Sequence, residues 1–179
     1  VVQFDGSDDY LSRTTFSNWP VDDITIFIVQ KSELVNQSTI SINGVYPTYG
    51  RFNAHIPWSD SNVYWDYGLT SGGSYGRIYQ SIPADFSSGF QLYKFDYDSS
   101  VDTLSFDYNG IEYQSGIADI SSIVDINGQT GFEFFLGRDD NNNDRYLNGD
   151  VAEVLIFDSV LTDDQVSKVN YYLSKKWGL

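Results

Sequence analysis

Apolar and polar residues alternate along most of this chain, which is the pattern of β-strands whose two faces meet different surroundings. In residues 51–56, Phe52, Ala54 and Ile56 alternate with polar residues, and residues 63–67 repeat the alternation. Pro57–Ser61 separates the two runs with turn-forming residues. The stretch 51–68 therefore predicts a hairpin with one apolar face and one face of hydrogen-bonding and aromatic groups.

Other segments carry equally clear strand signals. Ile24–Gln30 is β-branched and almost wholly apolar, which predicts a central strand covered on both faces. Phe90–Tyr97 and Thr103–Tyr108 form an alternating pair, and Asn109-Gly110 behind them is typical of a type I′ hairpin turn. Further short strands are predicted at Val1–Phe4, Tyr10–Leu11, Gln37–Ile42, Arg77–Gln80, Phe132–Leu136 and Val151–Phe157. About a dozen strands without intervening helices predict an all-β, two-sheet antiparallel sandwich.

One helix is predicted at the C-terminal end of the chain. Thr162 and Gln165 have the spacing of a capping box, in which each side chain bonds the other's backbone N–H. An apolar stripe at helical spacing follows, made of Val166, Val169, Leu173 and Trp177. Gly178 can end the helix. We expect this helix to be structural and to cover one end of the sandwich.

Length and composition set the broad class. The chain has 179 residues, which suits one domain spanning 1–179. It contains no cysteine, so disulfides, thiolate zinc sites and cysteine nucleophiles are excluded. Because no run of 18 apolar residues occurs, we expect no membrane insertion. The chain begins with Val1 and shows no signal segment, so we expect a processed protein or a part of a longer one.

The net charge of −15 narrows the range of partners. Such a field repels phosphate backbones, and we therefore expect no nucleic-acid partner. Two explanations of the acidity stay open. One is a solvated surface adapted to a saline habitat, and the other is a supply of carboxylates for divalent cations.

Four stretches resemble a known family. Phe4–Leu11 (FDGSDDYL) is similar to the opening of concanavalin A-like, laminin-G-type jelly-roll domains. Gly149–Asp158 (GDVAEVLIFD) and Tyr172–Leu179 (YLSKKWGL) are similar to the closing part of the same domains. His55–Asp60 (HIPWSD), with Tyr64–Asp66, resembles a motif of a subset found in phage and bacterial surface proteins. The resemblance spans essentially the whole chain.

The resemblance carries expectations about fold and function. It implies two antiparallel sheets, one of them concave, with a calcium site near the concave rim in many members. Members are mainly modules that bind glycans or proteins, adhesion domains or virion appendages. We therefore expect an extracellular or virion-surface location, with a glycan or surface polysaccharide as partner. Neighbouring capsid, fibre or adhesin subunits are the alternative partners.

The polar face of the predicted hairpin is the candidate ligand site. A sugar site needs flat aromatic rings and planar polar groups that pair with hydroxyls. Such groups are supplied here by Arg51, Asn53, His55, Trp58, Tyr64 and Asp66. The alternative is that His55 pairs with Asp66 across the hairpin while Trp58 packs at the rim. Trp65, with Val63, is expected in the core.

The segment 139–144 is the candidate metal site. Calcium prefers six to eight oxygen ligands, and a loop of carboxylates and amides can supply several. The proposed ligands are Asp139, Asp140, Asn142 and Asp144. The segment is not an EF-hand, because Arg145 stands where that motif needs glycine. Asp5, Asp8 or Asp9 would complete the site if the fold brings the N-terminus near, and a solvated turn is the alternative.

The sequence gives little support to the hypothesis that the protein is an enzyme. The four glutamates, Glu33, Glu112, Glu133 and Glu153, have no acidic neighbour two residues on, as a glycosidase strand would require. His55 is the only histidine, and no Gly-x-Ser-x-Gly elbow accompanies it. We therefore predict a non-catalytic recognition module for glycans. The competing hypothesis is a structural decoration or fibre domain that contacts protein subunits without binding glycans.

Overall fold

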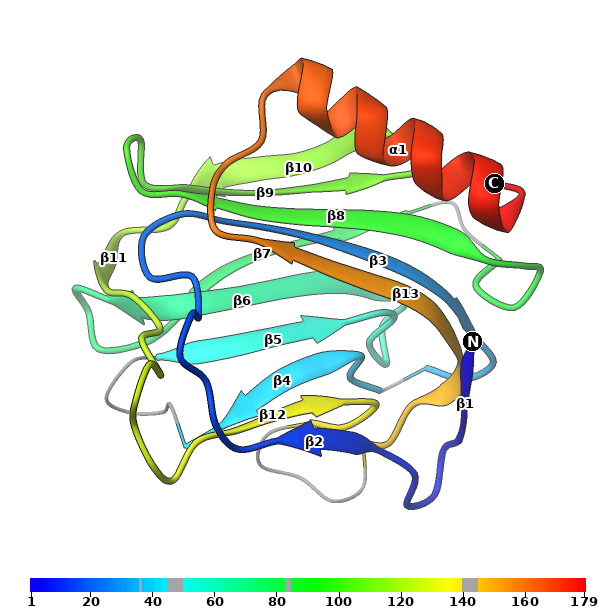
Figure 1. The fold of residues 1–179 in the computed structure, drawn as a ribbon, viewed down its shortest axis with the longest axis horizontal. Coiled ribbons are helices and arrows are strands. Elements are labelled where there is room, and N and C mark those ends of the chain that lie inside the picture. The colour runs from blue at the N-terminus through cyan, green and yellow to red at the C-terminus, as the bar shows by residue number, and fades with distance from the viewer. Residues whose placement is uncertain (36, 45–49, 83–84, 140–144) are drawn as a thin grey trace.

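The computed structural model describes residues 1–35, 37–44, 50–82, 85–139 and 145–179. Within these residues, thirteen strands form two antiparallel sheets that pack face to face, and one helix follows them (Figure 1). The six-stranded sheet has, from edge to edge, β1 (Val2–Asp5), β13 (Asn148–Phe157), β3 (Ile24–Ser32), β8 (Gln91–Asp98), β9 (Thr103–Tyr108) and β10 (Ile111–Ile117). This confirms the predicted two-sheet antiparallel sandwich.

The second sheet has seven strands and carries the predicted hairpin. Its order is β11 (Ile120–Ser122), β6 (Asn62–Thr70), β5 (Arg51–His55), β4 (Ile40–Asn43), β12 (Glu133–Leu136) and β2 (Leu11–Arg13), with β7 (Gly76–Ser81) also paired to β6. The hairpin β5–β6 pairs Ala54 with Trp65 and Asn53 with Asp66. The first pair faces the core and the second pair faces away from it.

Strand β3 shows why the sandwich needs a third layer. Ile24, Ile26 and Ile28 point into the main core between the sheets, whereas Phe27 and Val29 point to the opposite face. All five side chains are buried, which confirms the predicted central strand. Each sheet has an outer face, and the one behind β3 is apolar enough to require a cover.

The main core is built around large aromatic rings. Trp65 of β6 is fully buried and lies edge-on to Phe52, with ring centroids 5.3 Å apart. Its indole Nε1 donates a hydrogen bond of 3.1 Å to the carbonyl of Asp96 in the other sheet. A buried tryptophan that finds a partner for its N–H leaves no polar atom stranded in the core. The expectation that Trp65 and Val63 belong to the core is confirmed.

Local signals at turns and caps were reliable. Asn109 and Gly110 both have positive φ, at 49° and 79°, as a type I′ turn between β9 and β10 requires. Helix α1 (Asp163–Trp177) begins with the predicted capping box of Thr162 and Gln165 and ends at Gly178, which has φ 74°. The described part of the chain contains no helix that is long and apolar enough to span a membrane.

The position of α1 differs from our expectation. It does not cover an end of the sandwich but packs on the outer face of the six-stranded sheet, over β3, β8 and β13 (Figure 1). Its fully buried Leu173 contacts the cluster that contains Phe27 and Val29. Trp177 Nε1 and Tyr172 Oη donate to the carboxylate of Glu153 in β13 at 2.8 and 2.9 Å. The reason is the apolar outer face of β3, which the sequence pattern already indicated.

Replacing Leu173 by alanine tests this packing. We expect Leu173→Ala to lower the free energy of unfolding by about 2–5 kcal/mol, because it opens a cavity between helix and sheet. Urea unfolding followed by tryptophan fluorescence measures the loss. The matched control is Tyr171→Ala on the same helix, where the side chain is 67% exposed and the expected change is within about 0.5 kcal/mol. Equal stability of both variants would contradict the assigned packing.

Candidate functional site

Polar side chains of β5, β6 and β7 gather on the outer face of the seven-stranded sheet. Register places them in two rows that cross the strands. Asn53, Asp66 and Arg77 form the first row, because Asn53 pairs with Asp66 and Asp66 with Arg77. The second row holds His55, Tyr64 and Tyr79 in the same manner. Since alternate residues of these strands fill the core, the rows point away from it.

Two fully buried carboxylates hold three arginines in place. Asp66 accepts hydrogen bonds from Arg77 Nε and Nη2 at 2.6 and 2.7 Å, and Arg51 Nη1 lies 3.2 Å from it. Asp139 pairs with Arg51 Nη2 at 3.1 Å and with Arg145 Nη1 at 2.6 Å. Asn53 Nδ2 also donates to Asp139, at 2.6 Å. Arg51 therefore connects the two carboxylates. Burial raises the pKa of Asp66, and the two guanidinium groups oppose that rise.

Aromatic rings flank the arginines. The Arg145 guanidinium lies over the ring of Trp58, 4.4 Å from its centroid. Arg77 lies 4.9 Å from the centroid of Tyr64 and 5.0 Å from that of Tyr75. Cations above aromatic faces are attracted by the ring quadrupole. These contacts fix the orientation of the arginine side chains.

Together these groups line a pocket of about 230 Å³. Its described lining consists of Arg51, His55, Trp58, Tyr64, Tyr75, Arg77 and Arg145. Strands supply four of these residues, and the turns before β6 and β7 and the segment before β13 supply the others. No carboxylate is part of this described lining, since Asp66 and Asp139 lie behind the arginines. The pocket offers guanidinium donors and ring faces.

His55 is a neutral, anchored side chain. It is 1% exposed, and its Nδ1 lies 3.0 Å from Ser38 Oγ and 3.3 Å from the carbonyl of Gln37. Its ring packs on Trp58 with centroids 4.3 Å apart. Burial lowers the pKa of His55 from 6.5 to about 3, so the ring carries no charge at neutral pH. His55 therefore supports Trp58 in the lining of the pocket.

The predicted ligand residues divide into two groups. Arg51, His55, Trp58 and Tyr64 line the pocket. Asn53 and Asp66 are fully buried behind it, where Asp66 pairs with Arg51 and Arg77 and Asn53 donates to Asp139. The polar side chains of the hairpin are therefore only partly accessible to a ligand. The alternative pairing of His55 with Asp66 is wrong, because each has other partners.

Tyr75, Arg77 and Arg145 were missed at the sequence level. Arg77 stands in a predicted strand, but only the register of β7 on β6 brings it beside Asp66. Arg145 was noted solely as the residue that breaks the EF-hand pattern. The sequence offers no local signal for this group, because the five arginines are spread from position 13 to position 145 and only the fold brings three of them together.

The candidate metal segment differs in part from expectation. Asp139 is fully buried, and cationic donors surround its carboxylate where calcium would have to bind. We therefore correct the assignment of Asp139 to that of an arginine partner. Asp140, Asn142 and Asp144 lie outside the described residues. The fold does bring the N-terminal loop close to the flanks of this segment, since Tyr10 contacts Arg138 and Tyr146.

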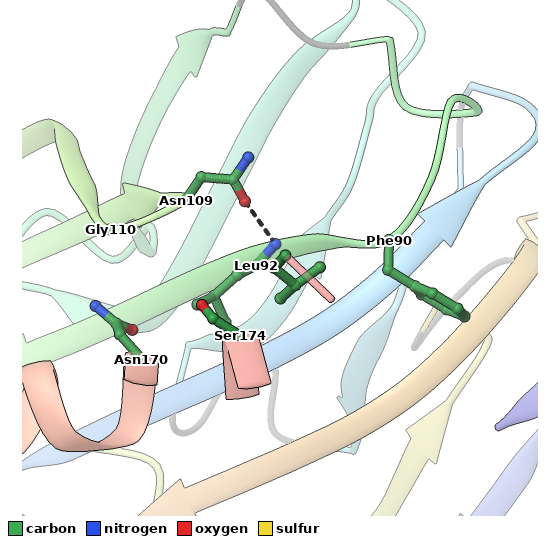
Figure 2. A pocket seen from close by; sticks show the side chains of 7 residues that line it. Phe90, Leu92, Asn109, Gly110, Asn170 and Ser174 are labelled. Atoms are coloured by element: carbon green, nitrogen blue, oxygen red, sulfur yellow. Dashed lines mark hydrogen bonds between the residues drawn. The ribbon is translucent and has the colours of Figure 1, made fainter. Parts of the chain in front are cut away.

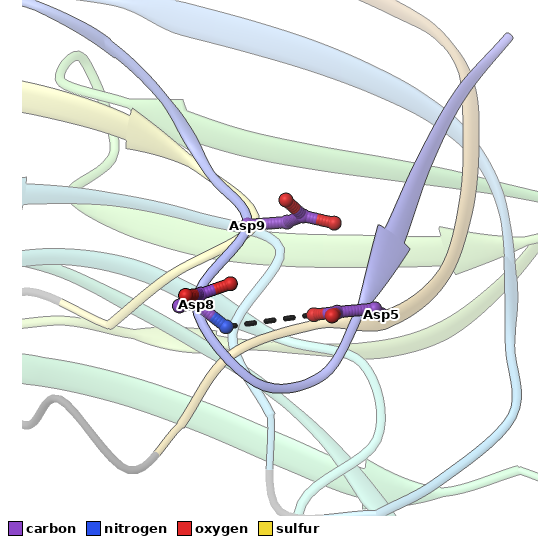
Figure 3. A group of neighbouring side chains, drawn as sticks. All are labelled: Asp5, Asp8 and Asp9. Carbon is purple, nitrogen blue, oxygen red and sulfur yellow. Dashed lines mark hydrogen bonds between the residues drawn. The ribbon is translucent and has the colours of Figure 1, made fainter.

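Three exposed carboxylates of that N-terminal loop lie together. Asp5, Asp8 and Asp9 each offer an oxygen, and these atoms lie within 4.8 Å of one another (Figure 3). Asp5 Oδ1 also accepts the backbone N–H groups of Ser7 and Asp8, at 2.8 and 3.4 Å. Carboxylate oxygens are the ligands that calcium prefers, and the donor set fits that ion in chemistry although three ligands fall short of the usual six to eight.

A larger pocket lies elsewhere, between α1 and the β9–β10 turn (Figure 2). It measures about 320 Å³, and its polar groups are Asn109, Asn170 and Ser174. Asn109 Oδ1 is already engaged by the backbone N–H of Leu92 at 2.9 Å. We place the functional site in the smaller pocket because charged and aromatic groups converge only there among these two pockets.

Comparison with known proteins supports the fold. No protein-family model matches the chain, and no curated protein matches it by sequence. Among solved structures, a CBM40 domain of the Ruminococcus gnavus IT-sialidase, bound to α2,3-sialyllactose, is 16% identical, with a TM-score of 0.65 over 89% of this chain and 97% of that one. The chain has a jelly-roll β-sandwich fold.

Two further structures share this fold. A SAP-like pentraxin from Limulus polyphemus is 14% identical, with a TM-score of 0.66 over 94% of this chain and 80% of that one. The binding domain of botulinum neurotoxin serotype D is 13% identical, with a TM-score of 0.68 over 94% of this chain and 41% of that one. At these identities the likeness concerns the fold alone, and the relation to laminin-G-type domains stays a prediction.

The buried histidine predicts a pH dependence of stability. The unfolded chain binds a proton at His55 near pH 6.5, whereas the folded protein binds it only near pH 3. The contribution of His55 to the free energy of unfolding is therefore fully present above pH 6.5. It is lost as the pH falls, by up to about 1.4 kcal/mol per pH unit between pH 6 and pH 5. Urea unfolding at several pH values measures the slope. Because the chain has one histidine, His55→Gln is a clean control and should flatten the slope. An unchanged slope in this variant would contradict the assignment.

Calcium binding stays a prediction and has a direct test. We expect millimolar calcium to raise the melting temperature above its value in chelator, by about 2–4 °C for each kcal/mol of binding free energy. Asp8→Asn with Asp9→Asn should abolish the rise if the N-terminal cluster binds the ion, and Asp140→Asn with Asp144→Asn if the second segment does. Sodium chloride of equal ionic strength controls for screening. A melting temperature that does not respond to calcium would contradict the prediction.

Proposed function

We propose that this chain is a non-catalytic recognition module that binds carbohydrate in the pocket of β5, β6 and β7. The observation that carries the proposal is the convergence of ring faces and planar donors there, from Trp58, Tyr64, Tyr75 and the three arginines. We further propose an extracellular or virion-surface location and a relation to laminin-G-type domains, as the sequence resemblance implies.

The chemistry of the pocket suits a sugar. Pyranose rings present C–H faces to aromatic side chains, and their hydroxyls pair with planar polar groups. Trp58, Tyr64 and Tyr75 are each partly exposed, so part of each side chain is accessible to a ligand. Beside the pocket, Tyr79 stacks on Tyr64 with centroids 5.0 Å apart and is 53% exposed. The ring of Tyr79 therefore extends the aromatic surface beyond the pocket.

The similar structures support the proposal at the level of class. CBM40 domains are carbohydrate-binding modules, and two of the matching structures contain bound sialyllactose. Those ligands belong to those proteins, and the 16% identity transfers no residue to this chain. What supports a glycan here is that a fold used for sugars has an aromatic and polar pocket on one sheet.

Geometry also favours binding without catalysis. A glycosidase needs two carboxyl groups that flank the glycosidic bond and exchange protons with it. Asp66 and Asp139 are fully buried and held by guanidinium groups, which leaves them unable to reach a bound sugar. His55 is neutral, and Ser38 and Gln37 engage its Nδ1. Some of the similar structures are parts of sialidases, and this activity is not proposed for the chain.

Removing the central ring tests the function. We expect Trp58→Ala to weaken glycan binding about tenfold or more, because it removes both an aromatic contact in the lining and the support of Arg145. A glycan array of neutral and acidic sugars, followed by isothermal titration with the best ligand, measures the effect. Tyr171→Ala, an exposed aromatic on α1, is the matched control and should bind as wild type does.

Two outcomes would count against this function. Equal binding by wild type and a folded Trp58→Ala variant would show that the site is misplaced. No binding to any glycan of the array would overturn the function, and co-purification with capsid, fibre or adhesin subunits would then favour a structural decoration domain.

A further inference from the structure

Arginine is concentrated at the pocket in a way that composition does not explain. The chain has five arginines and a net charge of −15, yet Arg51, Arg77 and Arg145 all line this one pocket. Random placement on an acidic surface would surround each cation with exposed carboxylates. Here the cations face the cavity, and their two carboxylate partners are buried behind them.

The charged groups of the described lining are all positive. Three guanidinium groups carry three positive charges, and Asp66 and Asp139 return two negative ones. His55 adds none, since burial lowers its pKa to about 3. Asp60, the nearby exposed carboxylate, accepts a hydrogen bond from Tyr64 Oη at 2.6 Å and is not part of the lining. The described lining therefore carries positive groups and no carboxylate, and the carboxylate partners of its arginines are buried behind it.

Hydrogen-bond donors are left over as well. Arg77 uses Nε and Nη2 on Asp66, and its Nη1 has no partner among the described residues. Arg145 uses Nη1 on Asp139, which leaves its Nε and Nη2 without a described partner. The two side chains are 34% and 27% exposed, so these donors are accessible from solvent. Neutralising the buried carboxylates does not require them.

The accessible donors are also held in fixed directions. Tyr64 and Tyr75 pack against Arg77, and Trp58 packs against Arg145. A planar guanidinium held in this way loses little conformational entropy when it binds an anionic oxygen group. Arginine forks match carboxylate and similar oxyanions better than a lysine ammonium does.

We infer that the glycan bound in this pocket is an acidic sugar, whose single carboxylate or sulfate group is bound by Arg77 and Arg145. The inference rests on the proposed function and specifies its ligand. A volume of about 230 Å³ accommodates one sugar ring with its substituents, which places the anionic group on the ring that enters the pocket. The accessible parts of Trp58 and Tyr64 then contact that ring.

The charge of the whole chain limits what else could bind. The net charge of −15 repels an extended polyanion, whose further charges lie within a Debye length of about 8–10 Å of the acidic surface. A ligand with one anionic group inside the pocket meets the guanidinium groups of the lining first. The same field opposes unspecific binding of acidic polymers and thereby adds selectivity.

Matched ligand pairs test the inference. The array should contain neutral glycans beside counterparts that differ by one sialic acid, one uronic acid or one sulfate, with lactose, 3′-sialyllactose and 3′-sulfated lactose as the titration set. We expect at least one acidic member to bind about 10–100-fold more tightly than its neutral partner, as charge-assisted hydrogen bonds to arginine allow. Its affinity should fall when sodium chloride is raised from 50 to 300 mM. Comparing carboxylate with sulfate members distinguishes the two anions.

Two variants assign the effect to the pocket. Arg145→Gln should abolish the preference for the acidic member and leave residual binding of the neutral one. Arg13→Gln removes the same charge from the exposed strand β2 and should keep the preference, which controls for net charge. Melting temperatures establish that both variants are folded. If Arg145→Gln does not fold, the matched pairs and the salt dependence of the wild type decide the question alone.

Each outcome separates the two proposals. A preference for acidic members that Arg145→Gln removes supports the inference. Equal or tighter binding of the neutral members would overturn the acidic ligand and leave the carbohydrate function in place. The same preference in wild type and Arg145→Gln would also overturn it. No binding to any member would overturn both.

Discussion

The structure of the pocket depends on Arg51, which lies between two fully buried carboxylates. Asp66 and Asp139 come from distant parts of the chain, and each would be costly to bury without a cation beside it. Arg51 contacts both carboxylates. Arg77 also pairs with Asp66, and Arg145 also pairs with Asp139. Loss of one partner from such a buried pair typically costs about 3–5 kcal/mol. The arrangement therefore ties the segment before β13 to the middle of the sheet.

The two sheets cover their outer faces by different chemistry. Behind β3 the outer face is apolar, and α1 covers it through Leu173. Behind β5 and β6 the outer face is polar, and ionic pairs with aromatic rings bury Asn53 and His55 almost as completely. The second cover is open at its centre, where the pocket lies. An apolar cover would have closed that face and left no polar donor for a ligand.

Features that depend on residues close together in the sequence were predictable, whereas features that depend on contacts between distant segments were not. Alternation in β5 and β6, the Asn109-Gly110 turn and the Thr162 capping box are local, and all were predicted correctly. The faces of the hairpin were also predicted, because side-chain direction follows from strand periodicity. Burial of the polar face was not, because it requires Arg77 and Arg145 to arrive from other segments.

Register explains the wrong pairings in the same terms. His55 and Asp66 lie on one face of the hairpin, but β5 and β6 pair His55 with Tyr64 and Asp66 with Asn53. The position of α1 was open for a related reason, since a stripe of apolar residues does not reveal which sheet it covers. Asp139 looked like a cation ligand because carboxylates in a polar loop suit calcium and arginine equally. Only the neighbours in space distinguish the two.

Stability and recognition share residues in this pocket, but they do not share them equally. Arg77 holds a fully buried carboxylate through two hydrogen bonds, so its main contribution is to the folded state. Arg145 shares Asp139 with Arg51 and Asn53, which keep that carboxylate paired when Arg145 turns to a ligand. An anion that enters the pocket competes little with Asp139 for Arg145, because Nε and Nη2 of Arg145 have no partner among the described residues. Because Arg77 mainly stabilises Asp66 while Arg145 has donors for a ligand, the pocket can bind an anionic group without breaking the ion pairs that stabilise the sheet.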